Sequence, residues 1–305
     1  MSEQTTTNNQ SIVDRVHENV HSVNPFNKDG EYGTKNVVLY KFLTILSWLL
    51  VVITSVYYTF ARPREGHSKS DRHRIWQHQP HTPFAMNEII VSIYWIVLYV
   101  MQMGYVVHFW HREEVYVKAA ANVGVHFVAH NLFLFGFIML WCRSYYYWAE
   151  LLLIVNFFNL SSAYFRHSTT PRFIHIPVVS GPLAWNFVAL YWCGAAAVNA
   201  HTLPARIVAN IFIWGIGAYG MFFLVAFKDY TMGVNLSVLA AAIGVSQFLT
   251  HIIAFQWIFA FVIMGVLFVF SVAVAGGAAP GLKGGEVVSE DRERAPLLDS
   301  AEDSV

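Results

Sequence analysis

Long apolar segments without a charged residue dominate the sequence. They run from Ile89 to Trp110, from Ala119 to Cys142, from Phe173 to Val198, from Ile207 to Phe227 and from Tyr230 through Ala279. A helix that crosses a membrane needs about 20 mainly apolar residues. The last segment, with 50 residues, is therefore long enough for two spans.

The pattern predicts eight membrane-spanning helices. They occupy about residues 39–60, 88–110, 119–141, 145–165, 176–198, 206–227, 231–248 and 252–275. Helices are expected because the segments lack the alternation of a membrane β-barrel, and unpaired backbone cannot face lipid. The predicted fold class is all-α, a compact polytopic bundle at 39–277. A polar tail at 1–38 and an acidic, disordered tail at 278–305 flank it.

Two details of the spans follow from local sequence. The polar residues from Gln247 to His251 are the expected turn between the last two helices. Pro177 and Pro182 near the start of the fifth span could break that helix and form a cavity. They could also mark a late start with Pro182 in the first turn, and this second interpretation is favoured.

Composition supports a membrane protein. Apolar residues make up 56% of the chain and charged residues only 12%, about half the usual quarter. A soluble protein of this composition would have too little polar surface to cover its core. The net charge is zero, and no basic cluster is dense enough to neutralise a phosphate backbone, so nucleic acid is not an expected partner.

The distribution of Lys and Arg predicts the orientation. An even number of spans places both tails on one side, where twelve Lys and Arg residues lie, against seven on the other side. The positive-inside rule therefore favours cytosolic tails. Five of the seven lie in the loop 61–87, which also contains His67, His73, His78 and His81. This loop is either a solvated connection or, facing an acidic compartment, a pH sensor.

Polar side chains inside the third and fourth spans are the main candidate site. His126 and His130 lie four residues apart and hence on one helical face, followed by Asn131. The next span carries Asn156 and Asn159.

Counting outward from the hairpin near Arg143 places these groups at similar depths. His130 is level with Phe157, and His126 is level with Ser161 and Ser162. The cluster is a proton relay or polar substrate site in one interpretation. In the other it is packing through hydrogen bonds between helices. A catalytic zinc needs about three protein ligands, and spacing fixes no third ligand, so we expect neither a metal nor a cofactor.

Glu150 is the one acidic residue well inside a predicted span. It lies six residues beyond Ser144, so an ion pair with Arg143 or a contact with a hydroxyl of Tyr145–Tyr147 is expected. An intramembrane carboxylate is a functional candidate by default, although a helix-end carboxylate that reaches the headgroups is equally compatible with the position.

Four segments resemble a family of fungal multi-pass membrane proteins of unknown function. They are the segments at 57–63, 131–137, 141–150 and 156–164. The resemblance would cover roughly residues 37–277. It implies a fungal endomembrane protein and supplies no activity and no catalytic residue.

The carboxyl tail resembles a sorting signal. Glu293, Leu297 and Leu298 match the acidic dileucine pattern that clathrin adaptors read, and Asn24-Pro25-Phe26 resembles an endocytic adaptor motif. A clathrin adaptor is therefore an expected partner beside the lipid bilayer. The expected location is a vacuolar or endosomal membrane rather than the plasma membrane.

The residues favour a transporter or channel-like protein for a small solute or proton. The path candidates are His126, His130, Asn131, Glu150, Asn156 and Asn159. A non-catalytic membrane organiser or trafficking component is one alternative, and a metal-dependent membrane enzyme acting on lipid is another. The sequence lacks a nucleophile with its base and acid, so a non-enzymatic protein is favoured.

Overall fold

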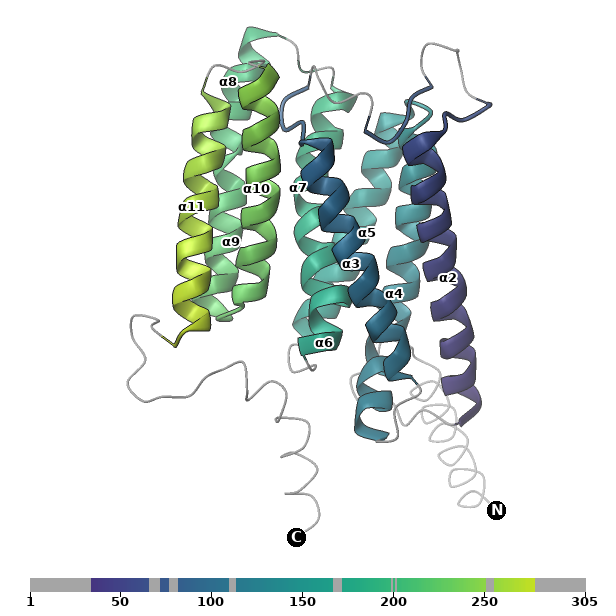
Figure 1. Ribbon diagram of the computed structural model, residues 1–305. Coiled ribbons are helices and arrows are strands. Elements are labelled where there is room, and N and C mark those ends of the chain that lie inside the picture. Colours follow the sequence, from purple (N-terminus) through teal and green to yellow (C-terminus); the bar gives the residue numbers. More distant parts are fainter. Residues whose placement is uncertain are drawn as a thin grey trace, which may run out of the picture.

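The computed structural model shows a bundle of long helices (Figure 1). It describes residues 34–65, 72–76, 82–109, 114–166, 172–198, 200, 202–250 and 255–277. The helices are α2 (Thr34–Phe60), α3 (Glu88–His108), α4 (Glu114–Trp141), α5 (Tyr146–Arg166), α6 (Arg172–His175), the π-helical turn η1 (Ile176–Ser180), α7 (Gly181–Ala197), α8 (Leu203–Phe212), α9 (Trp214–Ala226), α10 (Tyr230–Thr250) and α11 (Gln256–Ala275).

The described part of the chain contains eight helical stretches that are long and apolar enough to cross a membrane. The predicted all-α fold class and the eight spans are confirmed. The main difference is at the end of the seventh span, where α10 continues to Thr250. Gln247 therefore lies inside the helix, where its amide donates to Thr82 O at 3.3 Å, and the predicted turn at Gln247 was placed too early.

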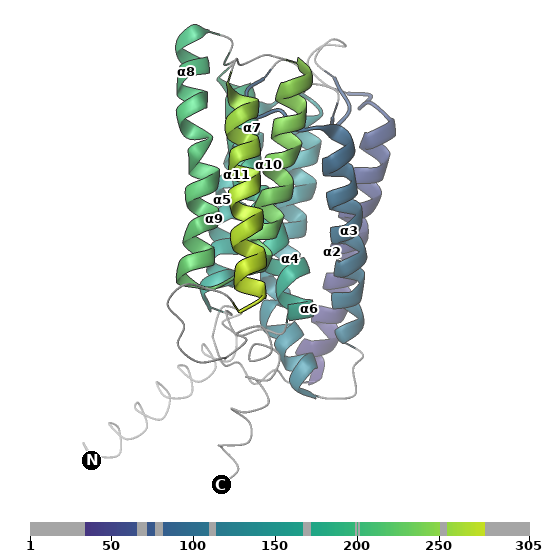
Figure 2. The ribbon, with the colours of Figure 1, turned by 60° about the vertical axis from the view of Figure 1, so that its left-hand side comes forward.

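The helices run roughly parallel to one axis and alternate in direction (Figure 1). We call the end where α2 begins and α11 ends the tail end, and the end where α2 ends and α3 begins the loop end. The consecutive helices α8 and α9 follow one another along a nearly common axis (Figure 2). Together they form the sixth span, Leu203–Ala226.

The fifth span, made by α6, η1 and α7, lies at the centre of the bundle. In its most apolar stretch 78% of the residues are buried, against 22% in α2 and α11. Helix α7 packs against α5 on one side and α10 on the other, and α4 packs between α2 and α5. The helices α9, α10 and α11 form a group at one side of the molecule (Figure 1).

Small residues permit the close contacts around α10. A Cβ on Gly244 would lie 2.9 Å from the Phe261 ring of α11. A Cβ on Gly220 of α9 would lie 2.6 Å from a methyl group of Leu267. Since lipid tails are as apolar as leucine, close packing of this kind drives association between helices in a membrane.

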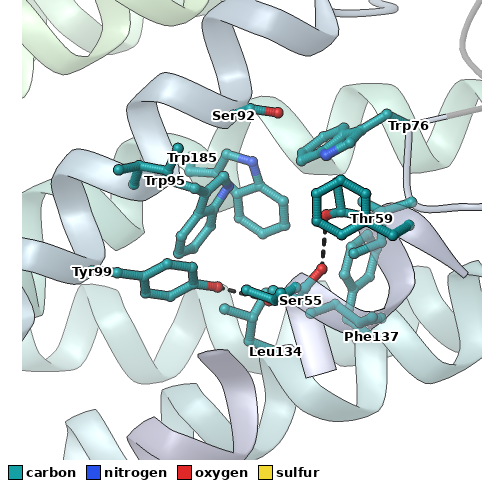
Figure 3. A pocket seen from close by; sticks show the side chains of 14 residues that line it. Ser55, Thr59, Trp76, Ser92, Trp95, Tyr99, Leu134, Phe137 and Trp185 are labelled. Carbon is teal, nitrogen blue, oxygen red and sulfur yellow. Dashed lines mark hydrogen bonds between the residues drawn. The ribbon is translucent and has the colours of Figure 1, made fainter. Parts of the chain in front are cut away.

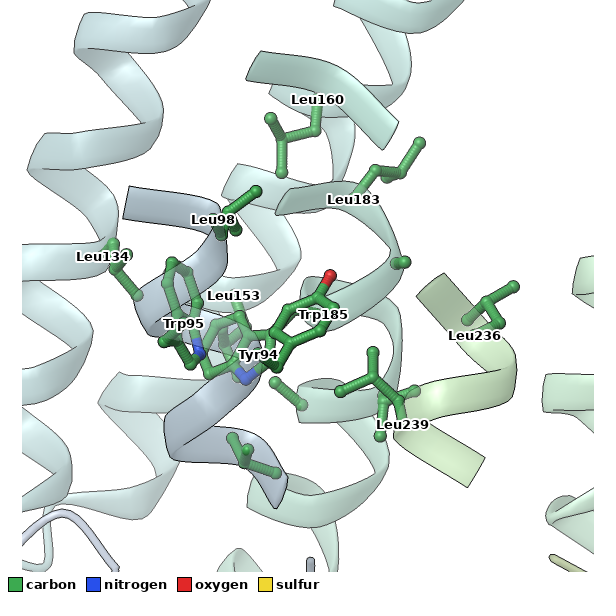
Figure 4. Close-up of a cluster of buried hydrophobic side chains, with 14 of the residues drawn as sticks. Tyr94, Trp95, Leu98, Leu134, Leu153, Leu160, Leu183, Trp185, Leu236 and Leu239 are labelled. Carbon is green, nitrogen blue, oxygen red and sulfur yellow. The ribbon is translucent and has the colours of Figure 1, made fainter. Parts of the chain in front are cut away.

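Aromatic and leucine side chains fill the interior between α3, α4, α5, α7 and α10. Figure 4 shows Tyr94, Trp95 and Leu98 of α3 beside Trp185 of α7. Leu236 and Leu239 of α10 pack into the same cluster. Closer to the loop end, the rings of Trp141 and Trp192 lie 4.0 Å apart between centroids. The core is therefore continuous from α4 to α10.

The fifth span contains a turn of π-helix at its prolines. The helix begins at Arg172 and passes through η1 into α7 without leaving helical dihedral angles at His175, Ser180 or Gly181. The expected late start with Pro182 in the first turn is therefore wrong. Gly181 N donates to Ile176 O, five residues back, and this wider turn is how the helix accommodates prolines that have no N–H to donate.

Side chains of α3 complete the bonding of this turn. The next bond of the π type would come from residue 182, which is proline, so Pro177 O would lack a donor. Gln102 Nε2 donates to Pro177 O at 3.1 Å, and Tyr94 OH donates to Gly181 O at 2.7 Å. Both α3 side chains are buried, so the π turn is held by its neighbour.

Candidate functional site

Histidines of α4 bond to asparagines of α5, much as the sequence predicts. His126 Nδ1 lies 2.9 Å from Asn159 Oδ1, and Asn159 Nδ2 donates to His126 O at 3.0 Å. His130 Nδ1 lies 3.0 Å from Asn156 Nδ2 and 3.3 Å from Asn156 Oδ1. The amide of Asn156 can therefore either donate to the His130 ring or accept from it.

The depths predicted by counting from the hairpin are correct to within one to three residues. His130 meets Asn156 rather than Phe157, and His126 meets Asn159 rather than Ser161 and Ser162. The counting assumes parallel axes with equal rise. An offset of one to three residues, about 1.5–4.5 Å along a helix, is of the size that tilted packing produces.

The His130–Asn156 pair continues to a third helix through a residue that the sequence analysis did not select. Asn156 Nδ2 donates to Asn186 Oδ1 on α7 at 2.7 Å, and Asn186 Nδ2 donates to Leu153 O at 3.0 Å. His130, Asn156 and Asn186 are each at most 1% exposed. A lone amide in an apolar span is the signal that could have identified Asn186.

Asn131, the remaining predicted residue of the third span, faces α2 instead. Its Nδ2 donates to Ser47 Oγ at 3.3 Å, and Ser47 Oγ donates to Thr44 O. Asn131 is thus separate from the His130–Asn156–Asn186 cluster, although it neighbours His130 in sequence.

Glu150 does not form the predicted ion pair. Arg143 directs NH1 to Met139 O at 2.8 Å and NH2 to Tyr58 OH at 3.3 Å. The Glu150 carboxylate faces α7 instead, where it lies against the Cys193 thiol. The predicted partners of Glu150 are wrong. Glu150 lies one turn into α5, on the side of the helix that packs against α7, and its carboxylate therefore points away from Arg143.

Gly194 leaves room for this carboxylate at the α5–α7 contact. A Cβ on Gly194 would lie 3.5 Å from Glu150 Oε1. The second oxygen, Oε2, is buried and has no hydrogen-bond partner in the described part of the chain. Glu150 is therefore a partly buried carboxylate whose second oxygen is open to a proton or a donor.

A second acid in the bundle, Asp229, is fully buried and was missed by the sequence analysis. It is 2% exposed and caps the start of α10, where Oδ1 accepts from Thr231 N, Thr231 Oγ1 and Met232 N at 2.5–3.1 Å. Its Oδ2 accepts from Tyr164 OH at 2.9 Å and pairs with His175 Nε2 at 3.0 Å. An Asp directly before an apolar run is an N-cap signal, but the sequence does not reveal that this cap is buried.

At the loop end, His73 is buried against the bundle, in contrast to a solvated loop. Its Nδ1 lies 2.9 Å from Arg74 O, and a carbonyl only accepts, so Nδ1 carries a proton. Its Nε2 lies 3.2 Å from Tyr146 OH, which also contacts Ser144 Oγ at 3.1 Å. The other loop histidines, His67, His78 and His81, lie outside the described residues.

These groups share one face of α5. At about 100° per residue, Tyr146, Glu150, Asn156 and Tyr164 fall within an arc of roughly 120° that faces α7. We call these four residues and their partners the α5 polar stripe; the partners are His73, Cys193, His130, Asn186, His175 and Asp229. From Tyr146 to Tyr164 the helix rises about 27 Å, close to the roughly 30 Å of a hydrocarbon core.

Metal ligands do not gather anywhere in the described ranges. No group of three or more His, Cys, Asp or Glu side chains there has an arrangement that could hold an ion. His126 and His130 point to different asparagines. The sorting residues Glu293, Leu297 and Leu298 and the Asn24-Pro25-Phe26 motif lie outside the described residues.

Eight apolar helices with polar groups between them define a multi-pass helical membrane protein. Residues 206–298 match the model of a family described as "Fungal protein of unknown function (DUF1774)". This confirms the resemblance to a fungal family of unknown function. The matched residues begin in α8, whereas the segments on which the resemblance rested all lie before residue 165.

The chain is also similar to a second protein of known sequence. An uncharacterized protein of Schizosaccharomyces pombe is 23% identical over 208 residues, which cover 64% of this chain and 75% of that protein. No solved structure matches the chain. Function must therefore be argued from the site itself.

Proposed function

We propose that this protein moves protons across its membrane along the α5 polar stripe. The observation that carries the proposal is the length of the stripe. Titratable groups lie at both ends and in the middle of one helix face that rises about 27 Å, nearly the thickness of a hydrocarbon core. Ionisable residues inside a membrane are costly and typically serve ion or proton pathways.

Three sites along the stripe, which we call stations, can each hold a proton. Glu150 and its open Oε2 form the station toward the loop end. His130 forms the middle station, since its buried Nε2 has no hydrogen-bond partner among the described residues. The Asp229–His175 pair, 3.0 Å apart, forms the station at the tail end.

Apolar layers separate the stations. Leu153 and Leu160, at most 1% exposed, lie on the same face of α5 between them. Along the helix, Glu150 and Asn156 are about 9 Å apart, and Asn156 and Tyr164 about 12 Å. Direct transfer over these distances is excluded, so each step requires water or side-chain movement. A closed resting state of this kind prevents a leak.

The variants needed for a test are expected to fold. Hydrogen bonds between membrane helices contribute on average only about 0.6 kcal/mol. Glu150→Gln keeps the shape and removes the titratable oxygen. Asp229→Asn keeps an acceptor for the α10 cap and removes the charge. Asn131→Ala is the matched control, because Asn131 is equally buried on α4 but bonds to α2.

The experiment measures proton flux into vesicles that contain the purified full-length protein and a trapped pH-sensitive dye. A pH gradient is imposed, with potassium and valinomycin compensating charge. We expect faster dye response than in protein-free vesicles, loss of that response in Glu150→Gln and Asp229→Asn, and retention in Asn131→Ala. Flux equal to that of protein-free vesicles, or flux unaffected by both stripe variants, would refute proton movement along the stripe.

We also propose a vacuolar or endosomal location with adaptor binding through Glu293, Leu297 and Leu298. The family match supports this, since it extends past α11 as far as Leu298. The eight spans among the described residues also support it, because an even number places the start of α2 and the end of α11 on the same side of the membrane.

A further inference from the structure

We infer that a cavity between α2, α3, α4 and α7 binds the acyl chain of a membrane lipid, which enters sideways from the bilayer. The cavity has a volume of about 340 Å³ and lies toward the loop end. It is separate from the α5 polar stripe and independent of the proton pathway. Ligand sites are mostly apolar hollows of about 300–1,000 Å³, and this cavity falls at the small end of that range.

The entrance faces lipid. Val56 and Phe60 of α2 and Ile96 of α3 line the cavity, and they are 53%, 74% and 61% exposed on spans that have no polar outer face. Side chains that are exposed on a membrane span face hydrocarbon. The molecules that reach this entrance are therefore those of the bilayer interior.

The aqueous side is covered by a short segment of the chain. Ile75 and Trp76 line the cavity from the loop end. Backbone bonds fix this segment to the bundle, since Ile75 N donates to Tyr58 O at 3.2 Å and Trp141 Nε1 donates to Ile75 O at 2.9 Å. Figure 3 shows Trp76 over one side of the cavity, opposite Trp95 and Tyr99. A lateral route is thus favoured over entry from water.

The walls suit a flexible chain. The rings of Trp95 and Trp185 meet at 75° and those of Phe137 and Trp185 at 78°. Surfaces at such angles do not form the flat slot that a rigid fused-ring molecule such as a sterol requires. A methylene chain can bend to follow them and gains dispersion contacts with each ring.

The three hydroxyl groups of Ser55, Thr59 and Tyr99 at the cavity bond within the protein. Tyr99 OH and Ser55 Oγ bond to each other at 2.8 Å, and Thr59 Oγ1 donates to Ser55 O at 2.7 Å (Figure 3). Trp185 Nε1 is buried and has no acceptor in the described part of the chain, and the Ser92 hydroxyl and the indoles of Trp76 and Trp95 also line the cavity. The remaining lining residues are apolar, so the cavity offers an acyl chain mainly dispersion contacts.

The test uses the full-length protein in phosphatidylcholine vesicles that contain a small fraction of a phosphatidylcholine with a photoactivatable diazirine on one acyl chain. A second sample carries a diazirine sterol instead. After illumination, mass spectrometry maps the labelled residues. We expect acyl labelling concentrated on the residues that line the cavity from α2 and α3, and no such concentration with the sterol.

Two variants block the cavity in different ways. Ser92→Phe fills it from α3, and Val56→Trp narrows the entrance at a lipid-facing position that the core does not need. Ser161→Phe is the matched control, because Ser161 is also partly buried but lies on α5 away from the cavity. We expect loss of the concentrated labelling in both blocking variants and no change in the control.

Three results would overturn the inference. Even labelling of all lipid-facing helices would show an annular contact only. Concentrated labelling by the sterol but not by the acyl probe would show that the cavity binds a sterol rather than an acyl chain. Labelling that survives Val56→Trp, a variant that leaves the core untouched, would place the bound chain elsewhere even if Ser92→Phe failed to fold.

Discussion

At the scale of single residues, Asp229 shows how this protein keeps a carboxylate in its interior. A buried charge is costly unless it is paired and hydrogen-bonded. Asp229 accepts from two backbone N–H groups and the Thr231 hydroxyl on Oδ1, and from Tyr164 and His175 on Oδ2. Glu150 has far fewer contacts, with Oε2 unbonded in the described residues. The two acids therefore differ in how firmly they hold a charge.

Cys142 provides a prediction about reactivity. It lies in the turn between α4 and α5, is fully buried, and forms no disulfide. Burial raises the pKa of its thiol to about 12, although the neighbouring Arg143 guanidinium acts in the opposite direction. The thiolate is the reactive species, and with its pKa raised to about 12 the Cys142 thiol stays protonated at neutral pH.

We therefore expect Cys142 to resist N-ethylmaleimide in the folded protein at neutral pH, with labelling that increases only as the pH approaches strongly alkaline values. Mass spectrometry of the labelled protein measures this. The control is the same protein denatured in detergent, where Cys142 should react readily. Rapid labelling of folded protein at neutral pH would show that the turn opens in solution.

At the scale of elements, the π turn of the fifth span depends on α3. Tyr94, Leu98 and Gln102 recur every four residues on one face of α3 and meet the turn together. Leu98 comes so close to Gly181 that an added Cβ would lie 2.7 Å from its methyl group. The irregular turn is thus stabilised by tertiary contacts rather than by its own backbone bonds.

Removing the Gln102 donor should weaken this element. In Gln102→Met the side chain keeps its length, but Pro177 O loses its donor inside the bundle, a loss that costs about 0.6 kcal/mol on average between membrane helices and up to about 1.7 kcal/mol. We expect a lower thermal unfolding temperature of the detergent-purified protein, followed by near-ultraviolet circular dichroism. Met103→Ala is the control on the same helix, since Met103 is 51% exposed to lipid. Equal stability of the two variants would show that the turn does not need α3.

The sequence predicted elements better than it predicted their contacts. Charge-free segments of about 20 residues identify spans, because membrane thickness fixes their length, and all eight were found. The start of the fifth helix was wrong, because Pro182 is compatible with a first turn and a π turn alike. The π turn is supported by the bond from Gln102 to Pro177 O, and Gln102 lies 75 residues before Pro177 in the chain.

The candidate site was predictable only within one hairpin. A short connection fixes the relative depth of α4 and α5, so His130 and Asn156 could be paired by counting. Asn186 and His175 reach the same stripe from the fifth span, and Asp229 from the start of α10. Their positions depend on how three helices pack, which no spacing within the sequence determines.

At the scale of the whole molecule, the arrangement of the helices constrains the tails. Eight alternating spans place the start of α2 and the end of α11 at the same end of the bundle (Figure 1). That end also carries Arg166, Arg172 and Lys228 at the ends of spans, as the positive-inside rule expects of a cytosolic face. A sorting signal in the carboxyl tail would then face the compartment in which adaptors operate.

This arrangement predicts the effect of altering the dileucine pair. A fluorescent protein fused to the amino terminus leaves the carboxyl tail unmodified and should mark vacuolar or endosomal membranes in the wild type. Leu297→Ala with Leu298→Ala should shift the fusion to the plasma membrane, because two methyl-sized side chains no longer fill the apolar pocket of an adaptor. The helical bundle, which ends at Ala275, is untouched by the change.

Val287→Ala with Val288→Ala is the matched control, an apolar pair in the same tail without the acidic residue at the required spacing. It should leave the distribution unchanged. An unchanged distribution in the dileucine variant, or an equal shift in both variants, would mean that the pair does not direct sorting. Protease treatment of sealed vesicles separates this outcome from a reversed orientation, since both tails should be digested from the cytosolic side and neither should be protected.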